Sequence, residues 1–203
     1  MTEVAATVAG VEVLVSDIDA REDALRATRL ASSLPRPGTS EGRQLRRWLT
    51  QVLVTSRVVA AEAAALGVTA DAAPSEDALL PDVAARLQVG SVAAAALEDP
   101  IGRALFVHVT AGVLVSDADV AEYHRRNPFR FNAGPAPTAG WRARRVAATL
   151  DEVWPAIASH LLAAARRQTF RRWLDARMAE LVVLSPGYEH PGDPRQPDNT
   201  HRH

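Results

Sequence analysis

The sequence contains no cysteine. This absence excludes disulfide bonds, thiolate nucleophiles and sulfur-ligated metal centres together, so any bound metal ion must have nitrogen and oxygen ligands. Lysine is absent as well, which excludes Schiff-base chemistry on a side-chain amine. Histidine and carboxylate side chains are therefore the main groups on which chemistry can depend.

Aromatic residues make up only 5% of the 203 residues, whereas hydrophobic residues make up 47%. A core of alanine, valine and leucine favours closely packed helices, so we expect an all-α fold. No stretch approaches the roughly 18 apolar residues that a membrane-spanning helix needs, and the formal net charge is only -1. We therefore expect a cytoplasmic protein that binds neither nucleic acid nor membranes.

Apolar residues that recur at steps of three and four predict the main helices. One helix is expected with Ser16 as its N-terminal cap, a second from Ser40 to about Leu66, and a long one from about Leu150 to Leu184. Shorter helices are expected near 79–87, 92–97 and 100–113, and a turn-and-strand piece over 7–15. We expect residues 1–184 to form one helical domain and residues 185–203 to form an extended C-terminal tail packed on it.

The segment 104–110 is apolar on nearly every side. This pattern predicts a buried helix, in which His108 is a core histidine with satisfied hydrogen bonds rather than a catalyst.

The segment from Val115 to Phe131 is the most distinctive stretch inside the chain. It is similar to a Val-Ser-Asp-x-x-Val-x-x-Tyr pattern, followed by Asn and Arg-Phe, that occurs in the SurA and PrsA class of parvulin-type peptidyl-prolyl isomerases and chaperones. The matching residues are Val115, Ser116, Asp117, Val120, Tyr123, Asn127, Arg130 and Phe131. The resemblance implies a SurA N-terminal-like helical domain, closed by the long C-terminal helix.

In that class of proteins, a parvulin domain follows this segment. Here only the loop 132–148 separates Phe131 from the long helix. A parvulin domain needs on the order of a hundred residues, so the parvulin domain is missing and we expect no isomerase activity.

The C-terminal stretch 185–203 concentrates histidines, carboxylates and prolines. His201 and His203 are two residues apart, so both imidazoles project to one side of an extended chain. Rigid proline turns reduce the entropy lost when ligands converge, so the residues of this stretch could together form a zinc, iron, copper or manganese site. The candidate metal ligands are His190, Asp193, Asp198, His201 and His203, of which His190, Asp198 and His201 are also the candidate catalytic residues. The alternative is a polar terminus whose histidines titrate freely in solvent.

Three functional hypotheses follow. The first is a parvulin-less protein repurposed as a biosynthetic enzyme or accessory protein, for example in actinobacterial secondary metabolism, acting on a small-molecule or carrier-bound substrate. The second is a non-catalytic, chaperone-like module that binds a peptide or protein client. The third is a homodimer in which the long helix or the tail is exchanged between subunits.

Overall fold

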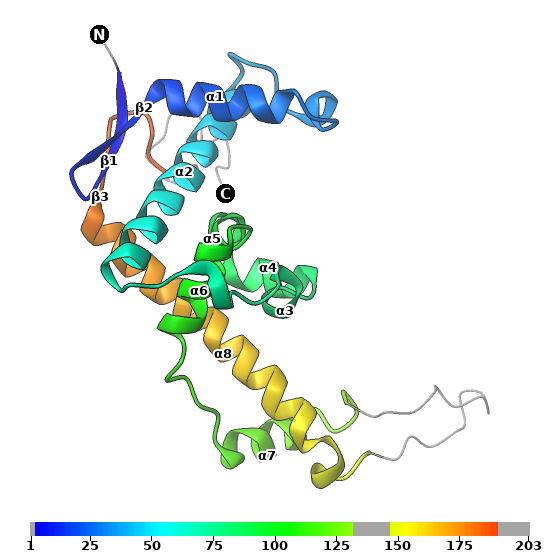
Figure 1. The fold of residues 1–203 in the computed structure, drawn as a ribbon. Helices are drawn as coiled ribbons and strands as arrows, with labels where there is room; N and C mark the ends of the chain where they lie inside the picture. Colours follow the sequence, from blue (N-terminus) through cyan, green and yellow to red (C-terminus); the bar gives the residue numbers. More distant parts are fainter. Residues whose placement is uncertain (1–2, 132–146, 191–203) are drawn as a thin grey trace.

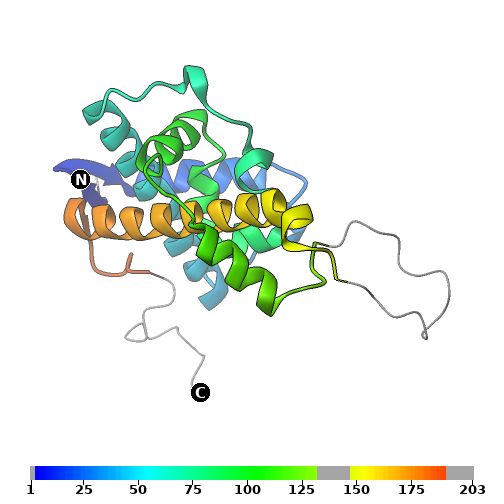
Figure 2. The same cartoon turned by 90° about the horizontal axis from the view of Figure 1, so that it is seen from below.

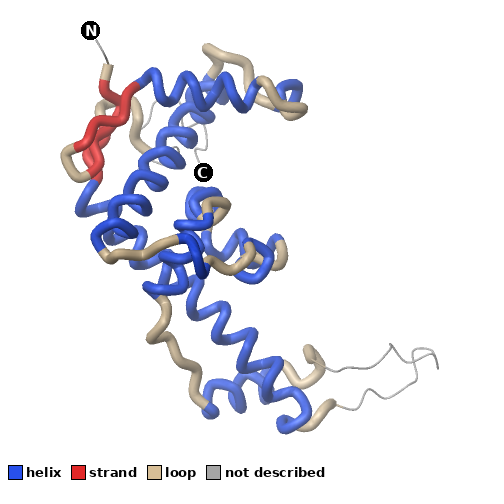
Figure 3. Tube along the Cα trace, viewed as in Figure 1, coloured by secondary structure: helices blue, strands red, loops and turns tan. Residues whose placement is uncertain are grey.

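The computed structural model describes residues 3–131 and 147–190, which contain eight α-helices and three short strands. Most of this part of the chain is helical, as the composition predicts. The all-α expectation needs one correction, because the strands form a small antiparallel sheet at one end of the molecule (Figure 3). None of the described helices is both long and apolar enough to span a membrane.

The sheet has the strand order β2-β1-β3, with β1 (Val4–Val8) in the middle between β2 (Val11–Leu14) and β3 (Val182–Leu184). Ala9 and Gly10 connect β1 to β2 with φ values of 48° and 82°. Two successive positive φ angles are typical of a type I′ turn, whose twist matches that of the flanking strands. The expected turn-and-strand piece is therefore a complete β-hairpin.

The third strand corrects the predicted end of the long helix. Helix α8 (Leu150–Leu181) stops three residues before Leu184, and the chain continues as β3. Val182 lies opposite Val8, and Val183 lies opposite Thr7. Periodicity could not separate the apolar run 181–184 from a last helical turn, whereas its β-branched valines suit an extended strand.

Two long helices carry the rest of the fold. Helix α2 (Ser40–Ala65) has the predicted bounds, and α8 contains 32 residues, which corresponds to about 48 Å. The shorter helices are α1 (Val15–Arg26), α3 (Glu76–Leu79), α4 (Val83–Val89), α5 (Ser91–Ala96), α6 (Pro100–Val109) and α7 (Asp117–Arg126). Helices α5 and α6 pack on α2, and α4 packs on α8 (Figure 1).

The main core lies where α2, α5, α6 and α8 meet. Val58 of α2, Leu97 and Phe170 are fully buried there. The rings of Phe106 and Phe170 have centroids 5.1 Å apart, so they join α6 to α8. This core fixes the middle of α8 against α2, which leaves both ends of α8 for other contacts.

Helix α7 packs on the N-terminal part of α8, away from the sheet (Figures 1 and 2). A separate small core around Val120, Val153 and Ile157 joins the two helices. The predicted capping box of α8 is confirmed, because Glu152 accepts the Thr149 N–H at 2.8 Å. The two helices therefore form an arm that projects from the main core.

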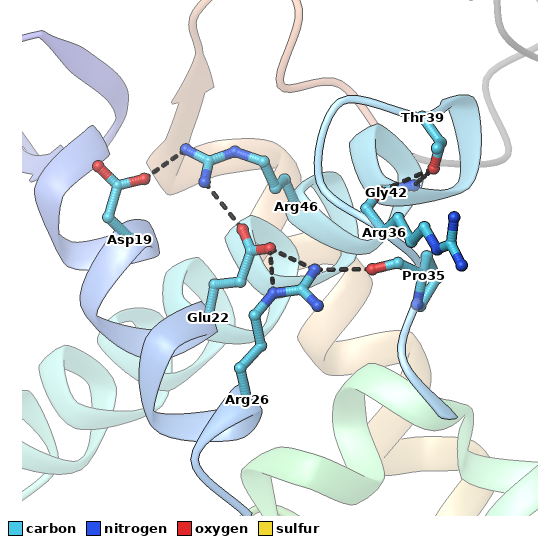
Figure 4. A network of polar contacts seen from close by, with 8 residues as sticks. All are labelled: Asp19, Glu22, Arg26, Pro35, Arg36, Thr39, Gly42 and Arg46. Carbon is cyan, nitrogen blue, oxygen red and sulfur yellow. Dashed lines mark hydrogen bonds and ion pairs between the residues drawn. The ribbon is translucent and has the colours of Figure 1, made fainter. Parts of the chain in front are cut away.

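A buried carboxylate joins α1 to α2 (Figure 4). The side chain of Glu22 is only 8% exposed and forms ion pairs with Arg26 at 2.7 Å and Arg46 at 2.9 Å. Arg46 also reaches the exposed Asp19 at 2.6 Å, and Arg26 donates to the Pro35 carbonyl at 2.7 Å. The network therefore holds α1, the loop after it and the start of α2 together.

Two local expectations were wrong. Helix α1 begins at Val15 and is capped by Leu14 rather than by Ser16, because Asp17 accepts the N–H of Leu14. His108 is exposed on α6 instead of buried. The residues of α6 that are buried are Gly102, Ala104, Leu105 and Phe106, so the helix is buried on one face only.

Candidate functional site

The residues that follow β3 are fixed to the N-terminal half of the chain. Ser185 donates from its N–H to the Ala5 carbonyl at 2.9 Å and from its hydroxyl to the Val4 carbonyl at 2.7 Å. The ring of Tyr188 packs against a small cluster that includes Ile18 and Leu49. The chain is therefore held beside β1 as it leaves the sheet.

Helix α2 holds the same segment through its polar side chains. The Arg47 guanidinium donates to the Gly187 carbonyl at 3.1 Å, and the Gln51 amide donates to the Tyr188 carbonyl at 3.3 Å. Both side chains are almost completely buried. These two contacts direct residues 185–190 along α2 and bring the exposed His190 to the edge of a cleft.

This cleft, which we call the central cleft, has a volume of about 360 Å³. It lies between α2, the junction of α4 with α5, and the C-terminal half of α8. Its lining residues are Gln51, Thr55, Val89, Gly90, Ser91, Val92, Ala93, Arg171, Leu174, Asp175, Met178 and His190.

The chemistry of the central cleft is mixed. Val89, Ala93 and Leu174 are buried and provide apolar surface. Arg171 and Asp175 are exposed, and their closest charged atoms are 4.0 Å apart, which is a loose ion pair. An apolar surface with a few polar groups at its edge is typical of small-molecule sites.

A second cleft lies on the other side of α5, between α5, α1 and α2. Its volume is about 390 Å³, and we call it the α1–α2 cleft. It is lined by Arg21, Ala24, Leu25, Thr28, Trp48, Leu49, Val52, Ala95 and Glu98. None of its lining residues comes from the segment 185–190, so the two clefts present different surfaces.

Of the five candidate metal ligands, only His190 belongs to the described part of the chain. Asp193, Asp198, His201 and His203 lie outside the described residues. Within residues 3–131 and 147–190, no group of three or more histidine, aspartate and glutamate side chains is arranged to hold a metal ion. His190 is thus the one predicted site residue whose surroundings the structure defines.

Sequence reasoning did not identify the other residues of the central cleft. Arg171 and Asp175 are four residues apart on α8, a spacing that is typical of a solvated helix face. Gly90 ends α4 and precedes α5 with a φ of 91°. A glycine between two short helical patterns was the available signal for the turn that opens this side of the cleft.

A model of a protein family of unknown function, DUF7158, matches residues 4–41. The match covers the β-hairpin, α1, the loop that follows and the first residues of α2. No curated protein and no solved structure matches the chain. The matched segment contains Asp19, Glu22 and Arg26 of the polar network, but none of the residues that line the central cleft.

Proposed function

We propose that the protein binds a small, partly apolar molecule, or an intermediate presented by a carrier protein, in the central cleft. In this proposal it serves a biosynthetic pathway as an enzyme or as an accessory protein. The observation that carries the proposal is the position of His190, which reaches the cleft because Arg47 and Gln51 hold the segment before it.

The residues of the cleft support a ligand with both apolar and polar parts. Leu174 and Met178 of α8 face the same space as Ser91, which lies at the start of α5. Arg171 is exposed and only loosely paired with Asp175, so its guanidinium can bind a carboxylate or phosphate group of the ligand. A volume of about 360 Å³ accommodates a small molecule rather than a folded partner.

Ligand binding can be detected at Met178 because the chain contains only two methionines. In a protein labelled with ¹³C-methyl methionine, a ligand in the central cleft shifts the Met178 signal in a saturable way. We expect Arg171→Gln to weaken the binding of carboxylate ligands, and Arg172→Gln to leave it unchanged. Arg172 is the matched control because it is the next residue of α8, is exposed and does not line the cleft.

The proposal has a metal-dependent version, in which His190, Asp193, Asp198, His201 and His203 supply ligands to a zinc, iron, copper or manganese ion. Mixed histidine and carboxylate ligation leaves coordination positions for water or substrate. Elemental analysis of the purified protein and calorimetric titration with each divalent ion test this version.

We expect one ion per chain, lost in His190→Ala and retained in His108→Ala, whose histidine is exposed on α6. If no ion binds, or if both variants bind equally, the metal-dependent version is wrong. The small-ligand proposal is tested separately by the Met178 signal.

A second candidate function is the binding of a peptide or protein client without catalysis. The observation that favours it is the α1–α2 cleft, where Leu25, Trp48 and Val52 line an open space that no described residue of the C-terminal segment reaches. Side chains of an extended client can occupy such an apolar groove.

Fluorescence anisotropy of labelled peptides rich in aromatic residues tests the client-binding function. Ala24 is exposed and lines the α1–α2 cleft, so Ala24→Glu introduces a charge there without removing core packing. We expect this variant to weaken peptide binding, whereas Ala20→Glu, one turn earlier on α1, leaves it intact. Equal binding by both variants would remove the α1–α2 cleft as the client site.

A further inference from the structure

A second cluster of chemically active side chains lies where α7 packs on α8, and it shares no residue with the lining of either cleft. The rings of Tyr123 and His160 have centroids 5.6 Å apart, and Phe131 lies 5.6 Å from His160 and 6.1 Å from Tyr123. The guanidinium carbon of Arg130 lies 5.9 Å from the centre of the Tyr123 ring. We call these four residues the arm cluster.

Three hydrogen-bond donors of the arm cluster have no acceptor in the described part of the chain. The Tyr123 hydroxyl oxygen is buried there without a hydrogen-bond partner. Arg130 forms no ion pair, and the ring nitrogens of His160 form no hydrogen bond, with residues 3–131 or 147–190. A buried hydroxyl without a partner is costly, so the Tyr123 hydroxyl favours an acceptor, and the exposed Arg130 can donate to the same acceptor.

Neighbouring side chains of the same types do have partners. Arg125 and Arg126 both contact the Glu122 carboxylate, and His124 Nε2 lies 2.9 Å from the Ala148 carbonyl oxygen. Arg125, Arg126 and His124 of α7 therefore have acceptors among the described residues, whereas the three donors of the arm cluster do not.

The electrostatic surroundings of the arm cluster are positive. Burial lowers the pKa of His160 below its ordinary value, and the charges of Arg130 and Arg167 lower the pKa further. Asp82 acts in the opposite direction but less strongly. Arg167 itself donates to uncharged oxygens of Gln88 and Leu79, so its positive charge is not neutralised by a direct carboxylate contact.

We propose that the arm cluster binds an oxyanion, either a carboxylate or a phosphate group, through the Arg130 guanidinium, the His160 imidazole and the Tyr123 hydroxyl. Guanidinium groups bind both oxyanions with two parallel hydrogen bonds. Arg130 is exposed and can reorient to admit the ion, while the Phe131 ring provides an apolar wall. The site is independent of the ligand proposed for the central cleft.

NMR of the histidine ring Cε1–H groups tests the proposal on the full-length protein. Inorganic phosphate and acetate are titrated separately, with sodium chloride of equal ionic strength as the blank. We expect a saturable shift of the His160 signal and a rise in the His160 pKa of about one pH unit, because an anion stabilises the imidazolium form. The His124 signal is the internal control, since its ring already has a partner.

Arg130→Gln should abolish the saturable response of His160, whereas Arg125→Gln, five residues earlier on α7, should retain it. Tyr123→Phe keeps the ring packing and should weaken binding several-fold. A response to phosphate alone assigns the site to phosphate groups, and a response to both ions assigns it to oxyanions in general. No saturable response to either ion, or an unchanged response in Arg130→Gln, would overturn the proposal.

Discussion

The Gln51 side-chain amide donates a hydrogen bond to the backbone carbonyl of Tyr188 at 3.3 Å, across 137 residues of sequence. This contact joins the middle of α2 to the segment after β3. Because His190 is only two residues further along the chain, the contact determines which surface His190 reaches. The position of the candidate site therefore depends on a link between the two halves of the chain.

Tyr188→Ala should release this segment. The Tyr188 ring is partly buried against the cluster containing Ala5, Ile18 and Leu49, so its removal should cost about 1–2 kcal/mol of stability. Hydrogen exchange measured by mass spectrometry should show faster exchange over 185–190 and little change in α6. Unchanged exchange over 185–190 would mean that the ring does not hold the segment.

Gly102→Ala should destabilise the protein. A Cβ atom at Gly102 would clash with the backbone oxygen of Ala96, so α6 would have to move away from α5. We expect a loss of about 1–3 kcal/mol, measured as a lower thermal midpoint. Gly112→Ala is the matched control, because a Cβ there meets nothing within 4 Å, and its midpoint should stay within about 2 °C of the wild type.

Glu22→Gln should break the connection between α1 and α2. The substitution removes the buried carboxylate from between Arg26 and Arg46, which are themselves partly exposed, and such a loss typically costs about 1–3 kcal/mol. Asp19→Asn removes the exposed partner of Arg46 and should cost less than about 1 kcal/mol. Urea unfolding of the two variants checks the difference, and equal losses would contradict the role assigned to Glu22.

His160 should make stability depend on pH. Because burial and the charges of Arg130 and Arg167 hold the pKa of His160 in the folded state below its ordinary value of about 6.5, the unfolded chain binds the proton more tightly. Stability should therefore fall as the pH drops from about 6.5 towards the lower folded-state pKa, and above about 6.5 the contribution of His160 should be complete and constant.

His160→Gln should reduce this dependence when free energies of unfolding are compared at pH values on both sides of the window. Glu152 and Asp119 also make the free energy of unfolding depend on pH, but in a lower pH range. Hydrogen bonds lower the pKa of each carboxyl from values that are already acidic. An identical pH dependence in the variant and the wild type would contradict the assignment to His160.

Local sequence signals predicted much of the helical framework. The capping box at Thr149 and the three- and four-residue periodicity of α2 placed those elements, because both features depend on residues close in sequence. The pairing of β3 with β1 was missed, since it joins residues more than 170 positions apart. His108 was misplaced because an apolar sequence window does not show which face of α6 lacks a neighbour.

The candidate site was only partly predictable. His190 was proposed from the density of chemically active residues in the tail, but the cleft beside it was not predicted. That cleft arises where α2, α5 and α8 meet, and each contributes residues that look ordinary in their own helix. Tertiary packing, rather than any local motif, brings Ser91, Arg171 and His190 to one space.

The most direct test of the account is the Met178 methyl signal, recorded while the protein is screened against small molecules that combine a carboxylate with an apolar group. The account predicts ligands that shift this signal in a saturable way and that lose binding in Ser91→Trp, where a large ring fills the central cleft. Ligands should still bind to Arg172→Gln. If no compound shifts the Met178 signal, or if Ser91→Trp binds as well as the wild type, the central cleft is not the ligand site.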